Sequence, residues 1–195
     1  MAKKTSKSFR PQSNRRRIAI ISLAGVAAIA FLALLVYAVW AAMQPEPILG
    51  EEIPIAGAEH IPEGQRAVDY NSDPPTSGQH YAQPAEAGFY EEAPPDERLV
   101  HNLEHGHIVV YYNCSGLSDT ACEELKDGIR QAMDAAGVVP STRTLKIAAV
   151  PRPGMEYLIT YTSWGKLYRA ETFNREEFLL FVKQNRNRAP EPLAP

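Results

Sequence analysis

The chain has 195 residues, of which 45% are hydrophobic and 22% charged, enough for one ordinary domain with appendages. The net charge of −3 is unevenly distributed: residues 1–17 carry +7, residues 18–43 carry none, and the remainder carries −10. Such an acidic remainder excludes the basic face that nucleic-acid binding requires. Two cysteines are too few for a disulfide-built miniprotein or a four-cysteine zinc ribbon.

The N-terminal part of the chain predicts a single-pass membrane anchor. Residues 1–17 are basic and lack apolar periodicity, so we expect a cytoplasmic tail. Residues 18–43 form an unbroken apolar run, long enough to cross the lipid bilayer as a helix, with Tyr37 and Trp40 towards its far end. The rest of the chain would then lie on the extracytoplasmic side of the cell membrane. A cleaved signal peptide is the alternative, although its apolar region is usually about 7–15 residues long.

Two proline-rich stretches precede the regular elements. Residues 44–69 contain four prolines and few apolar residues, which predicts a stalk in which His60 is solvated rather than a ligand. Residues 70–95 are dominated by turn formers, and so long a connection is uncommon unless it carries function. Its four aromatic residues argue against a disordered extension of the stalk, so we expect a stiff loop folded over a site.

The remaining pattern predicts a small α+β domain over residues 70–188, followed by a tail over residues 189–195. A short helix, with Asp96 as a possible N-cap, precedes elements in the order β-α-β-β-α, at residues 107–113, 119–136, 144–150, 157–163 and from Asn174 onward. We expect the first two strands to be parallel and the second pair antiparallel. This partly thioredoxin-like topology carries no activity, because the Cys-x-x-Cys motif is missing.

The two cysteines lie on either side of the turn between the first strand and the helix after it. In an oxidising compartment Cys114 and Cys122 are expected to form a disulfide, which by the chain-entropy model contributes about 2–3 kcal/mol for so short a loop. Thiolate ligands or a redox pair are the alternatives.

Most of the candidate metal ligands in this sequence are histidines in one short segment. His101, His105 and His107 fall within seven residues, and a helix would place the first two on one face, four residues apart. His80, in the turn-rich stretch upstream, could fold over as a further ligand. Neutral imidazole groups outside the cell suit Zn²⁺ or Cu²⁺, so we expect His80, His101 and His105 to bind a metal ion, with His107 or Met155 as the fourth candidate ligand. A hydrogen-bond network that fixes the turn before the strand is the alternative.

Three other residues bear on this site. Met155, beside a Pro-Gly turn, would add a soft ligand that favours Cu⁺, or it fills the core. Glu104 could act as a ligand, as an orienter of a histidine ring or as a general base. Tyr81, next to His80, is expected to support the ligands.

Several of these segments together resemble a bacterial and archaeal family, domain of unknown function 3105. They are the segments 75–81 (PTSGQHY), 101–106 (HNLEHG), 164–165 (WG) and 187–191 (NRAPE). The resemblance covers about residues 55–192 and implies that His80, His101, Glu104 and His105 are signature positions. Members often carry an N-terminal membrane anchor, and the family implies no reaction.

Two other classes of function stay open. The spacing His101-x-x-Glu104-His105 matches the inverted zincin motif, in which two histidines bind zinc and the glutamate activates water. Such a hydrolase would make Glu104 catalytic, but Gly106 leaves room for only a short helix. The other class is an interaction module without metal, which would use the acidic surface and exposed tyrosines to hold a protein partner near the membrane.

Overall fold

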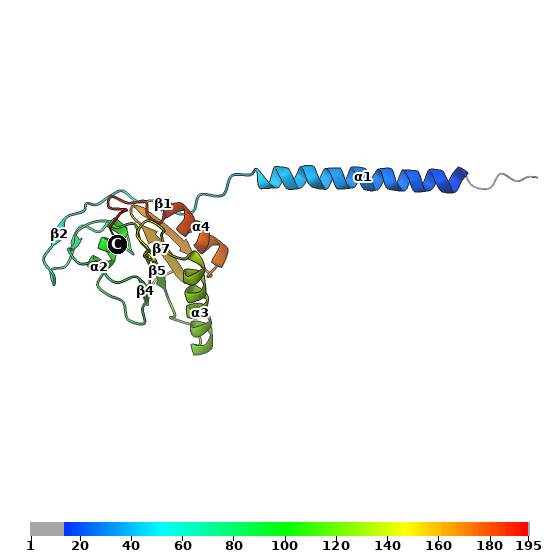
Figure 1. Ribbon diagram of the computed structural model, residues 1–195. Helices are drawn as coiled ribbons and strands as arrows, with labels where there is room; N and C mark the ends of the chain where they lie inside the picture. Colours follow the sequence, from blue (N-terminus) through cyan, green and yellow to red (C-terminus); the bar gives the residue numbers. More distant parts are fainter. Residues whose placement is uncertain (1–13, 195) are drawn as a thin grey trace, which may run out of the picture. The chain divides into compact units, whose positions relative to one another are not determined.

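The computed structural model describes residues 14–194 and divides the chain into two compact units, Met1–Pro47 and Ile48–Pro195. The first unit contains helix α1 (Asn14–Ala42), drawn in blue in Figure 1. Most of the predicted basic tail lies outside the described residues, and its last residues already belong to α1.

Helix α1 is long and apolar enough to cross a membrane. Within the described residues, the span Gly25–Ala42 meets the length and composition of such a helix, and none of it is buried inside the protein. The rings of Tyr37 and Trp40 lie 5.9 Å apart near its C-terminal end. The chain therefore contains a helix that could insert into a bilayer, with properties that a signal sequence shares.

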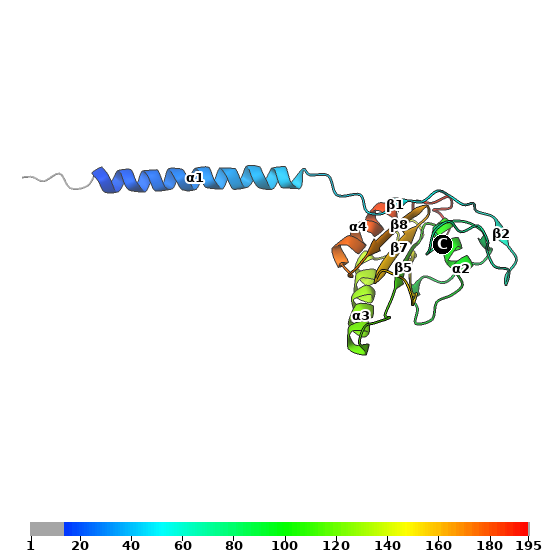
Figure 2. The same ribbon diagram turned by 180° about the vertical axis from the view of Figure 1, so that it is seen from behind.

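The second unit combines one mixed sheet of six strands, one two-stranded sheet and three helices (Figures 1 and 2). The elements, in chain order, are β1 (Glu51–Glu52), β2 (His60–Ile61), β3 (His80–Tyr81), β4 (Gly88–Phe89), α2 (Asp96–Glu104), β5 (Ile108–Tyr112), α3 (Asp119–Ala136), β6 (Ile147–Pro151), β7 (Ile159–Ser163), β8 (Lys166–Ala170) and α4 (Arg175–Asn185). The large sheet has the order β1-β8-β7-β5-β6-β4, and β2 pairs with β3.

Strand β5 is central because every one of its residues is apolar or aromatic and buried. It runs parallel to β6, as expected for two strands joined through helix α3. The expected pairing of β6 with β7 is wrong: β7 lies antiparallel on the other side of β5, with Val110 opposite Tyr161. Strand β8, which pairs with β7 across the two-residue turn Trp164-Gly165, was not predicted from the sequence.

The sheet is covered on both faces. Helices α3 and α4 pack on the face that presents Ile108, Val110 and Tyr112 (Figure 2). Ser118 caps α3 by accepting a hydrogen bond from the Ala121 amide, and the helix ends before Gly137. Helix α2 covers the opposite face, and Leu99 is among its core residues. One central strand thereby connects two cores.

Most of the predicted stalk packs within the second unit. Strand β1 pairs with β8, with Glu51 opposite Leu167, and β2 pairs in parallel with β3. Cys114 and Cys122 are joined as a disulfide with their Cα atoms 5.4 Å apart, the pairing expected from the sequence. The mixed α+β class is confirmed, with a sheet larger than expected.

Candidate metal centre

Helix α2 supplies two of the residues at the centre. Its N-cap is Pro95 rather than Asp96, whose carboxylate instead accepts hydrogen bonds from Arg152 at 2.9 and 3.1 Å. The helix ends at Glu104, and one turn of it brings the Nε2 atoms of His101 and His105 to 2.8 Å from each other. The predicted shared face of these two histidines is therefore present.

The proline-rich loop brings a third imidazole to the same place. Residues 74–78 are buried, and Gly78 has φ +125° with its amide donating to the Gly57 carbonyl at 2.9 Å. A Cβ at Gly78 would lie 2.8 Å from Asp69 Oδ1, so this close approach requires glycine. The loop then forms β3, in which His80 lies opposite His60 of β2. The two short strands thus place a pair of histidines side by side.

Four side chains converge into one group: His60, His80, His101 and Glu104. Each offers a ligand atom, and these atoms all lie within 4.8 Å of one another. The ring centroids of His80 and His101 are 5.0 Å apart, and His60 stacks on His101 at 5.1 Å. Three of the four residues are buried, whereas the side chain of His60 is 52% exposed, so the group meets solvent on the His60 side.

Two backbone carbonyl groups fix the tautomers of the buried rings. His80 Nδ1 lies 2.8 Å from the Gly78 oxygen, and His101 Nδ1 lies 2.6 Å from the Tyr81 oxygen. Because a carbonyl oxygen only accepts, both Nδ1 atoms carry a proton and donate it. In a neutral ring the Nε2 atom then holds a lone pair. Metal-binding histidines use this arrangement, with one nitrogen bound to a carbonyl and the other free for the metal.

The carboxylate of Glu104 faces one of these lone pairs. Its Oε2 atom lies 2.9 Å from His80 Nε2 and 3.9 Å from His60 Nε2. Among the described residues, these histidines are its only ion-pair partners, with no lysine or arginine within 4.0 Å. A buried carboxylate beside a lone pair is unfavourable without a positive charge, so a proton or a metal ion must compensate it.

The protonation of His101 is compatible with metal binding. Burial lowers the pKa of His101, the hydrogen bond to the Tyr81 carbonyl opposes this, and the neighbouring rings of His105, His80 and His60 lower it further. A lowered pKa favours the neutral ring, which is the form that binds a metal.

The other predicted ligands lie around this group. His105 contacts His101, and its Nε2 lies 3.6 Å from Glu191 Oε2. His107 turns towards Asn102, with its Nδ1 3.3 Å from the amide nitrogen. Met155 packs against the core beside α2. The structure therefore does not bring His107 or Met155 into the four-residue group.

Sequence reasoning missed two residues of this region. His60 was expected to be solvated, and the signal that could have identified it is its apolar neighbour Ile61, which is 7% exposed. Glu191 was assigned to a tail, although it falls in a segment that the family resemblance had singled out. Tyr81 was expected to support the ligands, and its backbone carbonyl accepts a hydrogen bond from His101 Nδ1.

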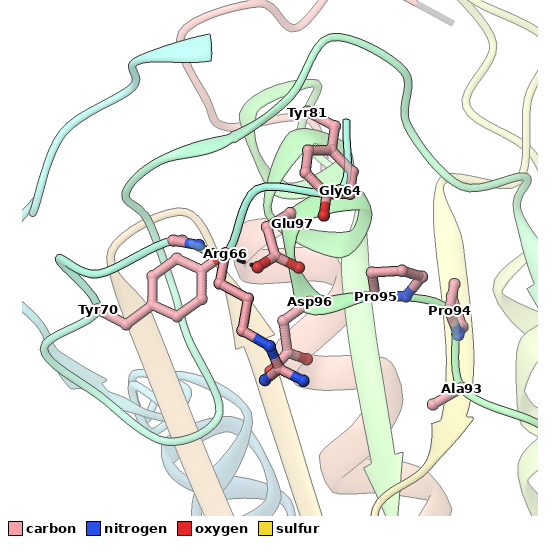
Figure 3. A pocket seen from close by; sticks show the side chains of 10 residues that line it. Gly64, Arg66, Tyr70, Tyr81, Ala93, Pro94, Pro95, Asp96 and Glu97 are labelled. Carbon is pink, nitrogen blue, oxygen red and sulfur yellow. Dashed lines mark hydrogen bonds between the residues drawn. The ribbon is translucent and has the colours of Figure 1, made fainter. Parts of the chain in front are cut away.

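A cavity of about 550 Å³ opens at the other end of α2. Figure 3 shows Asp96 and Glu97 between the ring of Tyr70 and the prolines that precede the helix. None of the four residues of the group lines this cavity. The Glu97 carboxylate already accepts a hydrogen bond from the Ala67 amide, so this cavity is lined in part by groups that hold the fold.

Comparison with known proteins gives one match. Searches of curated proteins and of solved structures found nothing similar. The family described as "Protein of unknown function (DUF3105)" matches residues 60–195, which include every residue of the candidate group. The chain therefore belongs to the DUF3105 family.

Proposed function

We propose that the second unit binds one transition-metal ion through His80, His101 and Glu104, with His60 as a fourth donor. The observation that carries this proposal is the close approach of two carbonyl-locked imidazoles, His80 and His101, to a buried carboxylate that has no lysine or arginine partner. The alternative, a hydrogen-bond network, requires a second proton on His80 so that its Nε2 can donate to the Glu104 carboxylate 2.9 Å away, whereas a metal ion binds both groups with His80 neutral.

The available donors favour Zn²⁺ or Cu²⁺. The group offers imidazole nitrogen and carboxylate oxygen, which suit these borderline ions. Cu⁺ prefers sulfur, but Met155 packs in the core and both cysteines are joined as a disulfide. Two donors on a tetrahedral zinc ion lie about 3.3 Å apart, so the 2.9 Å between His80 and Glu104 has to widen only slightly.

We further propose that α1 is a retained anchor and that the metal centre lies on the extracytoplasmic side. The basic residues before the apolar run favour a cytoplasmic N-terminus. The disulfide supports the same side, because such bonds persist in oxidising compartments. The partly thioredoxin-like order of elements is proposed as a scaffold only, since the two cysteines close a loop between β5 and α3 instead of forming a redox motif.

Metal content of the whole chain tests the proposal. The protein, purified in detergent without a histidine tag, is supplied with Zn²⁺ or Cu²⁺, dialysed and measured by elemental analysis. We expect about one ion per chain, lost in His80→Ala and in His101→Ala. His107→Gln removes a buried histidine outside the group and is the matched control. A wild-type chain without metal, or a His80→Ala chain that retains it, would refute the proposal.

Glu104→Gln separates this proposal from an inverted-zincin hydrolase. In such a hydrolase the glutamate is a base, so the variant would keep its metal and lose peptidase activity. Here the Glu104 carboxylate lies among the ligand atoms, so we expect the variant to bind metal more weakly. Peptidase activity that disappears at unchanged metal content would favour the hydrolase.

A further inference from the structure

The C-terminal segment Asn187–Pro192 docks onto the end of helix α2, where it was expected to form a tail. The Asn187 amide donates to the Gly106 carbonyl at 2.7 Å, and the Glu191 amide donates to the Glu104 carbonyl at 3.0 Å. The Glu104 carbonyl belongs to the last turn of α2, where carbonyl groups have no partner within the helix, and the Gly106 carbonyl follows two residues later. The segment thereby supplies hydrogen-bond donors to backbone carbonyl groups at and just after the end of the helix that carries candidate ligands.

A buried lysine holds the segment in place. Lys146 is fully buried, and its ammonium donates to the His105 carbonyl at 2.8 Å, to Asn187 Oδ1 at 2.9 Å and to the Pro192 carbonyl at 2.9 Å. All three donors of the ammonium are thus used, one towards α2 and two towards the segment. Lys146 connects the position of the segment to the position of His105.

The docked segment places a carboxylate beside the histidines. Glu191 Oε2 lies 3.6 Å from His105 Nε2, which in turn lies 2.8 Å from His101 Nε2. A separation of 3.6 Å is too long for a hydrogen bond and is of the size expected between two donors that share one metal ion. The side chain of Glu191 is 58% exposed and that of His105 is 10% exposed, so the carboxylate lies between solvent and the buried rings.

We infer that Glu191 is a further oxygen ligand, which together with His105 extends the metal centre to the C-terminal segment and raises the number of donors above four. This inference rests on the proposed function. It extends the centre from one helix and two short strands to a segment more than 80 residues farther along the chain. The added oxygen donor favours a divalent ion over Cu⁺. Binding of the ion and docking of the segment then become linked, so each strengthens the other.

Glu191→Gln tests this inference with little risk to the fold, because the amide has the shape of the carboxylate and the backbone hydrogen bond to Glu104 stays. Zn²⁺ affinity of the full chain in detergent is measured by competition with a chromogenic chelator. We expect the variant to bind at least about tenfold more weakly than wild type, since even the loss of a group that only orients a ligand weakens binding by that much. Glu171→Gln, which removes an exposed carboxylate outside the centre, is the control and keeps the wild-type affinity.

Hydrogen exchange of backbone amides in the C-terminal segment is a second measurement, which the loss of a charge alone would not change. Zn²⁺ should slow exchange of the Asn187 and Glu191 amides in wild type and have a much smaller effect in Glu191→Gln. Equal affinity in the two proteins, or equal slowing by Zn²⁺, would overturn the role of Glu191 while leaving metal binding through His80 and His101 intact. A wild-type chain that binds no Zn²⁺ would overturn the proposed function itself.

Discussion

Gly106→Ala tests how closely the C-terminal segment approaches α2. Gly106 has φ +83°, and a Cβ there would lie 2.7 Å from the Cα atom of Asn187, a backbone atom that cannot rotate away. The left-handed backbone costs an alanine about 1–2 kcal/mol. The overlap with Asn187 adds about 1–3 kcal/mol, as overpacking does in cores. We therefore expect the free energy of unfolding to fall by about 2–5 kcal/mol.

Gly154→Ala is the matched control for this experiment. Gly154 has nearly the same backbone angle, φ +85°, but a Cβ there meets nothing within 4 Å. It should therefore show only the backbone cost of about 1–2 kcal/mol. Urea unfolding of the full chain in detergent, followed by near-ultraviolet circular dichroism, gives both values. If the two variants differ by less than about 0.5 kcal/mol, the close approach of Asn187 does not constrain Gly106.

Three further predictions concern the core, the disulfide and the metal. Met155→Leu should leave Zn²⁺ affinity unchanged and lower the free energy of unfolding in urea by less than about 1.5 kcal/mol, because the residue packs against the core. A large loss of Zn²⁺ affinity would indicate that Met155 is a metal ligand. Replacing Cys114 and Cys122 together by alanine should lower the free energy of unfolding by about 2–3 kcal/mol without changing metal content; a fall in bound metal would contradict a purely structural disulfide. The metal-free protein, prepared with a chelator, should be about 4 kcal/mol less stable than the protein in free metal at a thousandfold the Kd, and this difference is measured as a lower melting temperature. An unchanged melting temperature would argue against a site specific to the folded state.

The sequence predicted the candidate metal centre best where its residues are close together along the chain. The helical spacing of His101 and His105 is a local property, and the proline-rich loop around His80 indicated a stiff cover over a site. His60 could not be identified in this way. Its place depends on a two-residue strand that pairs across the 18 irregular residues 62–79, and so short a strand leaves no alternation of residue types to detect.

The fold shows the same division between local and long-range information. Helix α3 was predicted with the bounds that the structure shows, because Ser118 and Gly137 mark its ends. The partner of β7 was predicted wrongly, because every residue of the strand is buried and its pattern does not distinguish β6 from β5 as a neighbour. Strand β8 did have a signal, the two-residue turn that ends in Gly165 with φ +66°, which is typical of a tight hairpin.

The parallel pairing of His60 with His80 has a consequence for how the protein would acquire a metal ion. These donors and those of α2 come together only when distant parts of the chain have folded, so an extended polypeptide has no preformed site. A chain exported in an unfolded state would therefore cross the membrane without a bound metal ion. Metal binding would follow folding after export. The metal ions available in that compartment, and not those in the compartment of synthesis, would then determine which ion is bound.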